Sequence, residues 1–153
     1  MTDFGLTPVG VVRCTRTEPT DDGWDAESAR IELLPPFDER AFRGLDGFSH
    51  CLVVFVFDRA TWSDDRMLRR PRGNPDWPEV GIFAQRAKDR PNRLGVSVAR
   101  IVAVEGTVLH VAGLDAVDGT PVVDVKPWMD GFGPRGPVTE PTWATDLMDG
   151  YWS

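Results

Sequence analysis

GIFAQRAKDRPNRLGVSVARI, residues 81–101, is the stretch that decides the fold. In it, a run of polar residues with proline and glycine directly precedes an apolar run that is typical of a strand. A second stretch, GLDAVDGTPVVDVKPW at residues 113–128, repeats this arrangement. A rigid sheet can hold reactive side chains on the loops beside its strands. Both stretches therefore predict a functional site on loops that flank a sheet.

Outward from these two stretches, short apolar runs bounded by turn-forming residues predict further strands. HCLVVFVF, residues 50–57, is an almost unbroken apolar run, too short for a typical helix, and it indicates a central strand. Glu105–Thr107 is typical of a hairpin turn between two other runs. The predicted strands cover residues 8–14, 30–33, 50–57, 80–84, 95–104, 108–112 and 122–125.

The fold class follows from the shortage of helical periodicity. No long amphipathic segment occurs before Trp143, so we expect a mainly β fold: a single closed or partly open barrel with short helices. Asp38 is a candidate cap for one such helix, which runs to Arg43. Gly131–Gly136 satisfies GxGxxG, but no strand precedes it and Pro134 opposes a following helix, which excludes a Rossmann site.

Two segments outside the strands are candidate binding elements. Residues 58–78 contain many charges and three prolines. Long excursions of this kind are often lids or binding loops. The tail TWATDLMDGYW, residues 142–152, predicts one short helix that lays its aromatic side chains on the body of the domain or on a partner.

Length and composition indicate one domain, residues 1–153, with a core at about 8–128 and a C-terminal extension at 129–153. No apolar run approaches the roughly 20 residues of a membrane span, and the N-terminus lacks a signal-peptide pattern. We therefore expect a cytoplasmic protein without membrane contact. The two cysteines and two histidines have no ligand-like spacing, so no metal site is expected.

The charge distribution bears on nucleic-acid binding. Seventeen basic against 24 acidic residues give a net charge of −7, whereas proteins that hold nucleic acid usually present a basic face. The arginines do cluster, with Arg69 and Arg70 in RMLRRPR and with Arg86 and Arg90 shortly after them. These clusters predict a phosphate-binding surface. The alternative is a pair of solvated loops whose charges are neutralised by nearby carboxylates such as Asp89.

AKDRPNRLG, residues 87–95, predicts a loop of fixed shape. Pro91 biases Arg90 towards extended geometry, and Asn92 readily enters the left-handed region of backbone conformation. Gly95 permits another part of the chain to approach closely. A loop of this kind fixes the directions of its side chains, so Arg90 and Asn92 are candidates for substrate binding or for shaping the loop.

Arg86 ends the apolar run before this loop. Its guanidinium suits a bidentate grip on a carboxylate of a ligand, and the alternative is a structural salt bridge to Asp89 or Asp118. In LDAVDGTP, residues 114–121, aspartates can cap turns by accepting backbone N–H bonds. We expect Asp115 to contact a ligand and Asp118 to shape the turn.

VVDVKPW, residues 122–128, places Asp124 and Lys126 on one face of a strand. Such a pair contributes little to stability when exposed but matters in a cavity. Lys126 is thus a candidate for stabilising bound anionic groups, and the alternative is a structural pair on the barrel. His50, at the entrance to its strand, is expected to be a structural hydrogen bonder.

Together with RGLDGFSH at residues 43–50, these motifs resemble the TsaA-like family, whose best known members are the TrmO methyltransferases. The resemblance runs from about Pro8 to Trp128. It implies a β-barrel homodimer that uses S-adenosylmethionine to methylate threonylcarbamoyl-adenosine beside the anticodon of tRNA. The residues implied in cofactor binding are Asp58, Arg59, Arg86, Val96, Leu114, Asp115, Ala116 and Val117.

The chain departs from the family pattern at three places. Arg93 stands where the RPNP motif has its second proline, which predicts a looser loop with an added charge. Asp58 stands where many relatives have histidine. TEPTDDGWD, residues 17–25, lacks the arginine-glutamine-proline element of longer members.

The leading interpretation is a methyltransferase that modifies a nitrogen of tRNA-borne threonylcarbamoyl-adenosine. A sulfonium methyl is already electrophilic, so catalysis needs chiefly in-line placement of the nucleophile and exclusion of water. The sequence does not identify a catalytic base; Asp58, Asp118 and Asp124 are the candidates to accept the proton. One alternative is methylation of a small nucleoside-like or secondary metabolite, which the acidic charge and the lack of an additional C-terminal domain favour. The other is a non-catalytic cofactor-sensing or interaction module that uses the aromatic tail.

Overall fold

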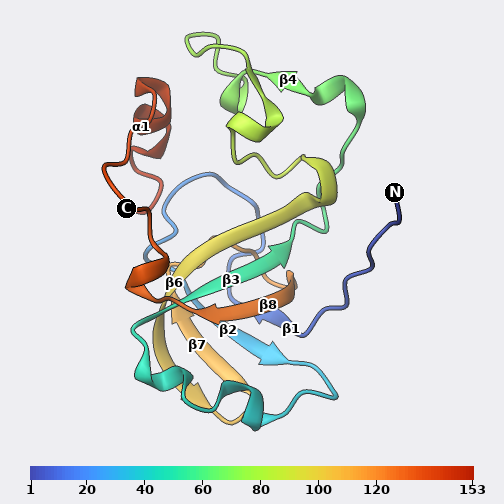
Figure 1. Ribbon diagram of the computed structural model, residues 1–153, viewed down its shortest axis with the longest axis vertical. Helices are drawn as coiled ribbons and strands as arrows, with labels where there is room; N and C mark the ends of the chain where they lie inside the picture. The colour runs from blue at the N-terminus through green and yellow to red at the C-terminus, as the bar shows by residue number, and fades with distance from the viewer.

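Six strands close into a barrel in which every neighbouring pair is antiparallel (Figure 1). The computed structural model describes residues 1–153. Around the barrel the strands follow one another in the order β1-β2-β7-β6-β3-β8, and β8 pairs back with β1. Their bounds are Gly10–Arg13 (β1), Ser28–Leu33 (β2), His50–Val56 (β3), Leu94–Glu105 (β6), Val108–Ala112 (β7) and Pro121–Pro127 (β8). The prediction of a mainly β barrel that is not a Rossmann fold is confirmed.

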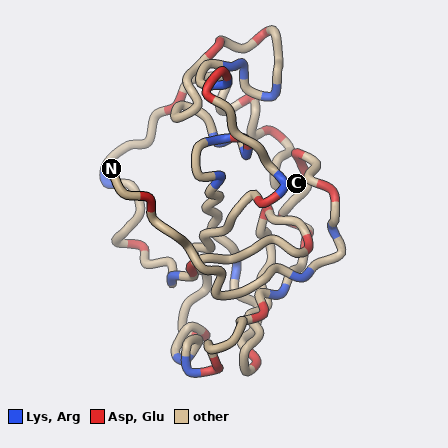
Figure 2. The backbone as a smooth tube through the Cα atoms, turned by 90° about the vertical axis from the view of Figure 1, so that its right-hand side faces the viewer, with Lys and Arg blue, Asp and Glu red and all other residues tan.

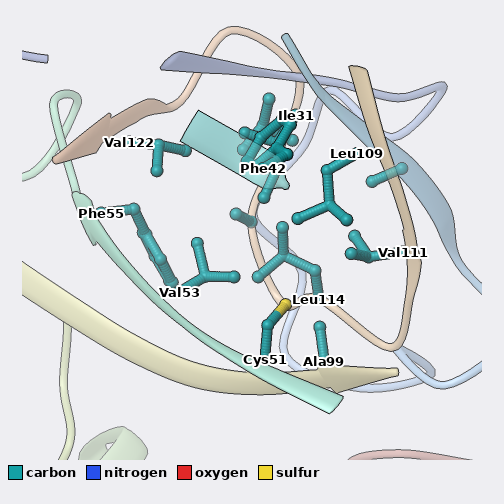
Figure 3. Close-up of a cluster of buried hydrophobic side chains, with 13 residues drawn as sticks. Ile31, Phe42, Cys51, Val53, Phe55, Ala99, Leu109, Val111, Leu114 and Val122 are labelled. Carbon is teal, nitrogen blue, oxygen red and sulfur yellow. The ribbon is translucent and has the colours of Figure 1, made fainter. Parts of the chain in front are cut away.

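Alternation along the strands fills the interior. Cys51, Val53 and Phe55 of β3 point inwards and are buried, while the residues between them lie half-buried on the outer face. The interior cluster also receives side chains from all the other strands and from the loop after β7 (Figure 3). Each fully buried Val or Phe side chain contributes about 1.5–3 kcal/mol to folding. Burial of these alternate positions therefore fixes the register of the strands.

Gly95 shows why this barrel needs glycine at one position. It lies directly opposite Phe55 in the β3–β6 ladder. A Cβ atom there would lie 2.6 Å from Cζ of Phe55 and 2.9 Å from Cζ of Phe57. The two aromatic rings meet edge to face, with centroids 5.2 Å apart. The predicted close approach at Gly95 is confirmed, and it lets two large rings pack against the backbone of β6.

The excursion between β3 and β6 stands at one end of the barrel (Figure 1). Within it, β4 (Leu68–Arg69) and β5 (Val80–Gly81) form a two-stranded ribbon of their own. The predicted strand at residues 80–84 is wrong in its second half, where a turn of 3-10 helix runs from Ile82 to Ala84. The pairing with β4 ends at Gly81, so Ile82 and the 82% exposed Phe83 take no part in the ladder.

The helices are short, as predicted. Asp38 caps the first of them, accepting a hydrogen bond of 3.0 Å from the backbone N–H of Arg40. The one α-helix, α1, runs from Thr142 to Met148. The 3-10 helices are Glu39–Phe42 (η1), Leu45–Gly47 (η2), Asp64–Arg66 (η3), Pro71–Gly73 (η4), Ile82–Ala84 (η5), Pro91–Arg93 (η6) and Asp130–Phe132 (η7). None of the helices has the length and apolar character needed to cross a membrane.

Candidate functional site

The first half of β6 has a strand partner on one side only. β3 pairs with β6 from Leu94 to Arg100, whereas β7 joins β6 only from Arg100 onwards. Arg86 reaches the backbone of this half-strand, where its Nη2 donates to the carbonyl oxygen of Val96 at 2.6 Å. The Val96 side chain is 40% exposed. Two of the predicted cofactor-binding residues, Arg86 and Val96, are therefore in direct contact.

Arg86 makes no salt bridge. Neither Asp89 nor Asp118, the two carboxylates weighed as its structural partners, pairs with it: Asp89 binds Arg66 at 3.3 Å, and Asp118 accepts from the backbone N–H of Cys14 at 3.1 Å. The exposed guanidinium of Arg86 thus keeps most of its N–H donors for other acceptors. This is the donor set that a carboxylate of a ligand requires.

The loop after Arg86 has the fixed shape that its sequence predicts. Asn92 adopts φ +61°, in the left-handed region, and Arg93 adopts φ +52°. Arg90 turns back and its Nη1 donates to the carbonyl of Gln85 at 2.8 Å. Arg90 and Asn92 therefore shape this loop, and whether they also touch a substrate stays a prediction.

Arg93 tightens the loop, and the prediction that it loosens the loop is wrong. Its guanidinium donates to the carbonyls of Asp58 and Ala60, at 3.3 Å and 3.1 Å. Its own carbonyl accepts from Phe57 N–H at 2.8 Å. These three bonds hold the loop against the end of β3, so the departure from the proline motif adds contacts to the rim.

The segment after β7 divides into buried and accessible residues. Leu114 and Ala116 are buried and belong to the barrel core, so their side chains face away from any external ligand. Asp115 and Val117 are half-buried. Asp118 ties this segment to β1 through the bond to Cys14, in keeping with the predicted turn-shaping role. Only backbone atoms of Leu114 and Ala116 are available for the cofactor contacts that were predicted there.

Asp115 carries an unusual carboxylate. Oδ2 accepts a short hydrogen bond from the hydroxyl of Tyr151, whereas Oδ1 is buried and has no partner. Burial and the Asp115 charge raise the pKa of Tyr151 well above its usual value, and the charges of Arg86 and Arg72 oppose that shift. Tyr151 and Asp115 are therefore a bonded pair on which the Arg86 charge acts, and we call these three residues the cluster. Sequence reasoning placed the aromatic tail on the body of the domain or on a partner but gave Tyr151 no role in a site.

Arg16 organises the loop between β1 and β2, next to this cluster. It stacks on Trp24, 3.5 Å from the ring centroid, and donates to the carbonyl of Asp22 at 2.7 Å. Arg59, a predicted cofactor contact, donates to the carbonyl of Thr17 at 2.8 Å. We call the segments around the cluster the loop collar; it comprises residues 14–27, 57–93, 113–120 and 149–153.

The other predicted site residues lie apart from this cluster or are already engaged. Lys126 binds Asp124 at 2.8 Å, so the predicted pairing of these two side chains is present. Both side chains are largely exposed rather than enclosed in a cavity. Asp58 is exposed and its carboxylate has no hydrogen-bond partner. His50 bonds with the hydroxyl of Ser49 at 2.7 Å, consistent with the structural role expected of it.

The arginines of the excursion all have partners within the chain. Arg69 donates to the carbonyl of Asp89, and Arg70 to that of Trp77. Arg66 pairs with the Asp89 carboxylate, and Arg72 pairs with Asp22 at 3.1 Å. Figure 2 shows acidic and basic residues interspersed along these loops. Carboxylates thus neutralise Arg66 and Arg72, in keeping with the alternative of solvated loops, whereas Arg69 and Arg70 bond to carbonyls and keep their charge.

One shallow surface hollow lies elsewhere. It is lined by residues of η1, η2 and the β6–β7 turn, among them Arg43 and Val104. These elements lie at the end of the barrel away from the excursion (Figure 1). No group of three or more His, Cys, Asp or Glu side chains is arranged as metal ligands would be. The candidate site is thus the cluster of Arg86, Asp115 and Tyr151 beside the half-paired part of β6.

Comparison with known proteins gives the class to which this barrel belongs. The chain matches the family described as the tRNA-methyltransferase O N-terminal domain over residues 14–133, and it belongs to that family. The predicted TsaA-like, TrmO-type membership is confirmed. The candidate residues Arg86 and Asp115 lie inside the matched range, whereas Tyr151 lies beyond it.

Individual relatives are similar over most of this chain. It is 41% identical over 105 residues to the putative S-adenosylmethionine-dependent methyltransferase RcsF of Pseudomonas aeruginosa, covering 68% of this chain and 46% of the relative. It is 35% identical over 138 residues to a probable S-adenosyl-L-methionine-binding protein of Methanothermobacter thermautotrophicus, covering 88% and 96%. The crystal structure of TrmO from Pseudomonas aeruginosa superimposes with a TM-score of 0.72 at 31% identity, covering 90% of this chain and 61% of that one. The chain therefore spans less than half the length of RcsF.

Proposed function

We propose that this protein is an S-adenosylmethionine-dependent methyltransferase that modifies a nitrogen of threonylcarbamoyl-adenosine beside the anticodon of tRNA. Membership of the TrmO N-terminal domain family supports the reaction class. A relative in Escherichia coli (strain K12), 33% identical over 139 residues and covered for 59% of its length, is named tRNA (adenine(37)-N6)-methyltransferase. Two observations carry the proposal: the Arg86 guanidinium is free of any carboxylate, and the buried Oδ1 of Asp115 has no partner.

The residues present fit S-adenosylmethionine, which supplies an electrophilic methyl group on sulfur. Arg86 has the donors to hold the carboxylate of the amino-acid moiety, since its present partner is a single backbone carbonyl. Oδ1 of Asp115 can accept a hydrogen bond from an O–H or N–H group. Val96 and Val117 present partly exposed apolar surface. We assign Asp58 and Arg59 to the rim, with backbone contacts at Leu114 and Ala116.

The chain's own contribution to the reaction is placement and exclusion of water, because alkyl transfer to a positioned nitrogen needs little further chemistry. A proton leaves the acceptor nitrogen. Of the three candidate acceptors, Asp118 already holds Cys14 N–H and Asp124 already holds Lys126. Asp58 is exposed and has no side-chain partner, so we assign the proton to it.

The macromolecular context is also part of the proposal. We propose tRNA as the substrate, a homodimer as the working form and the cytoplasm as the location. A second copy would bring further basic residues to the acceptor, although each chain carries a net charge of −7. Lys88 is the basic residue of the AKDRPNRLG loop without a partner in this chain.

A second candidate keeps the cofactor and replaces tRNA by a small nucleoside-like acceptor. The specific observation in its favour is that Arg66, Arg69, Arg70 and Arg72 are all bound within the chain. A guanidinium whose charge is paired with a carboxylate, as in Arg66 and Arg72, contributes less to holding phosphates.

Nucleoside mass spectrometry of tRNA tests the proposal. Cells that lack this protein should lose the methylated form of threonylcarbamoyl-adenosine, and the pure chain with S-adenosylmethionine should restore it on their tRNA. Restoration only on free nucleosides would favour the small-acceptor candidate. Cofactor binding without any product would indicate a non-catalytic module instead.

A further inference from the structure

The C-terminal end of the chain is bound to the loop between β1 and β2 through its backbone. The N–H groups of Gly23, Trp24 and Asp25 all donate to carbonyls of the tail. Gly23 and Trp24 donate to the carbonyl of Tyr151, at 2.8 Å and 3.1 Å, and Asp25 donates to that of Trp152 at 2.7 Å. Trp24 is buried and anchors this loop. The tail is thus an integral part of the loop collar.

This anchoring fixes where the Tyr151 side chain goes. Its ring packs edge to face against Trp152, with centroids 4.9 Å apart. The hydroxyl then reaches Oδ2 of Asp115, which is 36 residues earlier in the chain. Because its pKa is raised, mainly by burial, the phenol stays protonated and donates at every physiological pH. A residue beyond the matched family domain therefore holds a carboxylate that lies within that domain.

A carboxylate that is gripped at one oxygen cannot rotate freely, so its second oxygen keeps one direction. In Asp115 that second oxygen, Oδ1, is buried and has no partner. A buried acceptor without a partner is unfavourable until a donor reaches it. Polar groups held in this way by a second layer of bonds recognise ligands more sharply than groups left free to move.

We propose that Tyr151 is a positioning residue of the candidate site: its hydroxyl fixes the Asp115 carboxylate so that Oδ1 accepts from an O–H or N–H donor of the nucleoside part of S-adenosylmethionine. The inference rests on the proposed function and extends it to the tail. The tail of this chain thereby completes a cofactor site that the barrel and its loops only partly build.

Calorimetric titration of the full-length chain with S-adenosylmethionine and with its demethylated product tests the inference. Tyr151→Phe removes one hydroxyl and should weaken binding of both ligands about tenfold, the lower end of the effect of a hydrogen bond to a charged group. Thr145→Val is the matched control, since it removes a hydroxyl of the same tail that bonds only to Glu140, at 2.7 Å. The control should bind like the unmodified chain.

A double-mutant cycle separates positioning from general stability. In the Asp115→Asn background, Tyr151→Phe should weaken binding much less than it does alone, because the two residues act as one unit. Thermal midpoints of all variants show whether a loss of affinity follows a loss of folding. Equal affinities of Tyr151→Phe and Thr145→Val, or losses that are additive with Asp115→Asn, would overturn the inference and leave the proposed function intact. If the unmodified chain binds neither ligand, both proposals fall together.

Discussion

The barrel and the loop collar are held together by different interactions. Thirteen buried residues form the barrel cluster, and nearly all their contacts are apolar. Leu114 and Ala116 of the loop collar belong to that cluster, whereas much of the rest of the loop collar is crosslinked by arginines that donate to backbone carbonyls. These arginines are Arg16, Arg59, Arg69, Arg70, Arg86, Arg90 and Arg93. One chain thus uses hydrophobic burial for its scaffold and charged hydrogen bonds for its site.

The difference explains how an acidic protein can carry conspicuous arginine clusters. Carbonyls of irregular loops have no ladder partners, and a guanidinium with five N–H donors can satisfy several of them. Arg93 does so for Asp58 and Ala60, and Arg16 for Asp22 and Gly23. Arginines used in this way order the loops that surround a site.

The largest effect should come from breaking the barrel. Phe55→Ala removes a ring that is 1% exposed and packed against Gly95 and Phe57, and should lower the free energy of unfolding by about 3–5 kcal/mol. Phe83→Ala removes the same ring from an 82% exposed position in the loop collar and should change it by less than about 0.5 kcal/mol. Urea denaturation of both variants measures the contrast. Similar losses would mean that Phe83 is covered in solution.

A loop-collar residue should affect binding more than folding. Arg86→Ala should weaken S-adenosylmethionine binding by about 1.5–3 kcal/mol, the range for hydrogen bonds to a charged group, because the ligand carboxylate loses its partner. Arg90→Ala should instead lower stability, since Arg90 holds the carbonyl of Gln85. Arg30→Ala on β2, an exposed arginine, is the matched control. Titration calorimetry measures the affinities of the variants, and thermal midpoints measure their stabilities. The same combination of losses in the Arg86 and Arg90 variants would contradict the assignment.

Sequence patterns could predict the barrel because short apolar runs bounded by turn-forming residues are typical of strands. His50–Phe57 and residues 95–104 are two such runs, and the structure places both in the barrel as adjacent strands. The left-handed conformation of Asn92 and the close approach at Gly95 were predictable from the residues themselves, since asparagine tolerates a positive φ and glycine has no Cβ atom.

The contacts of the loop collar were not predictable in this way. The bond between Tyr151 and Asp115 joins residues whose neighbours along the chain give no sign of each other. The carbonyl that Arg86 binds lies ten residues on, in a strand whose second neighbour begins only at Arg100. An arginine in a sequence shows its charge but not its acceptor, so the clusters at Arg69 and Arg70 suggested phosphates where the structure has carbonyls.

Salt dependence sharpens this point. If tRNA is the substrate, log activity should fall with log salt, and each lost phosphate contact should reduce the slope by about 0.7–0.9. Lys88→Ala should reduce the slope by that amount, because Lys88 is exposed and unpartnered. The double variant Arg69→Ala, Arg70→Ala should keep the slope and lower the thermal midpoint instead. A flatter slope in the double variant would show that these two arginines exchange their carbonyls for phosphates.

The smallest effect should appear at alkaline pH, where one titrating group reports on the stability of each region. The Cys51 thiol lies in the barrel, and the Tyr151 hydroxyl lies in the loop collar. Burial raises the pKa of the Cys51 thiol from 9.0 to about 11. Below pH 9 the thiol is protonated in both folded and unfolded chains, so its contribution to stability is constant. Between pH 9 and 11 only the unfolded chain releases the proton, and that contribution is lost.

The pKa of Tyr151 is also raised, from 10.0, by burial first and by Asp115 second. The stability that its protonated hydroxyl contributes should therefore be lost as the pH rises above about 10, one pH unit later than for Cys51. Urea unfolding at successive pH values should therefore fall less steeply for Cys51→Ala from pH 9 upwards, and for Tyr151→Phe only from about pH 10. Parallel curves for the three proteins would contradict burial of both groups, whereas a change in Tyr151→Phe alone would show that the loop collar stays closed while the barrel opens to solvent.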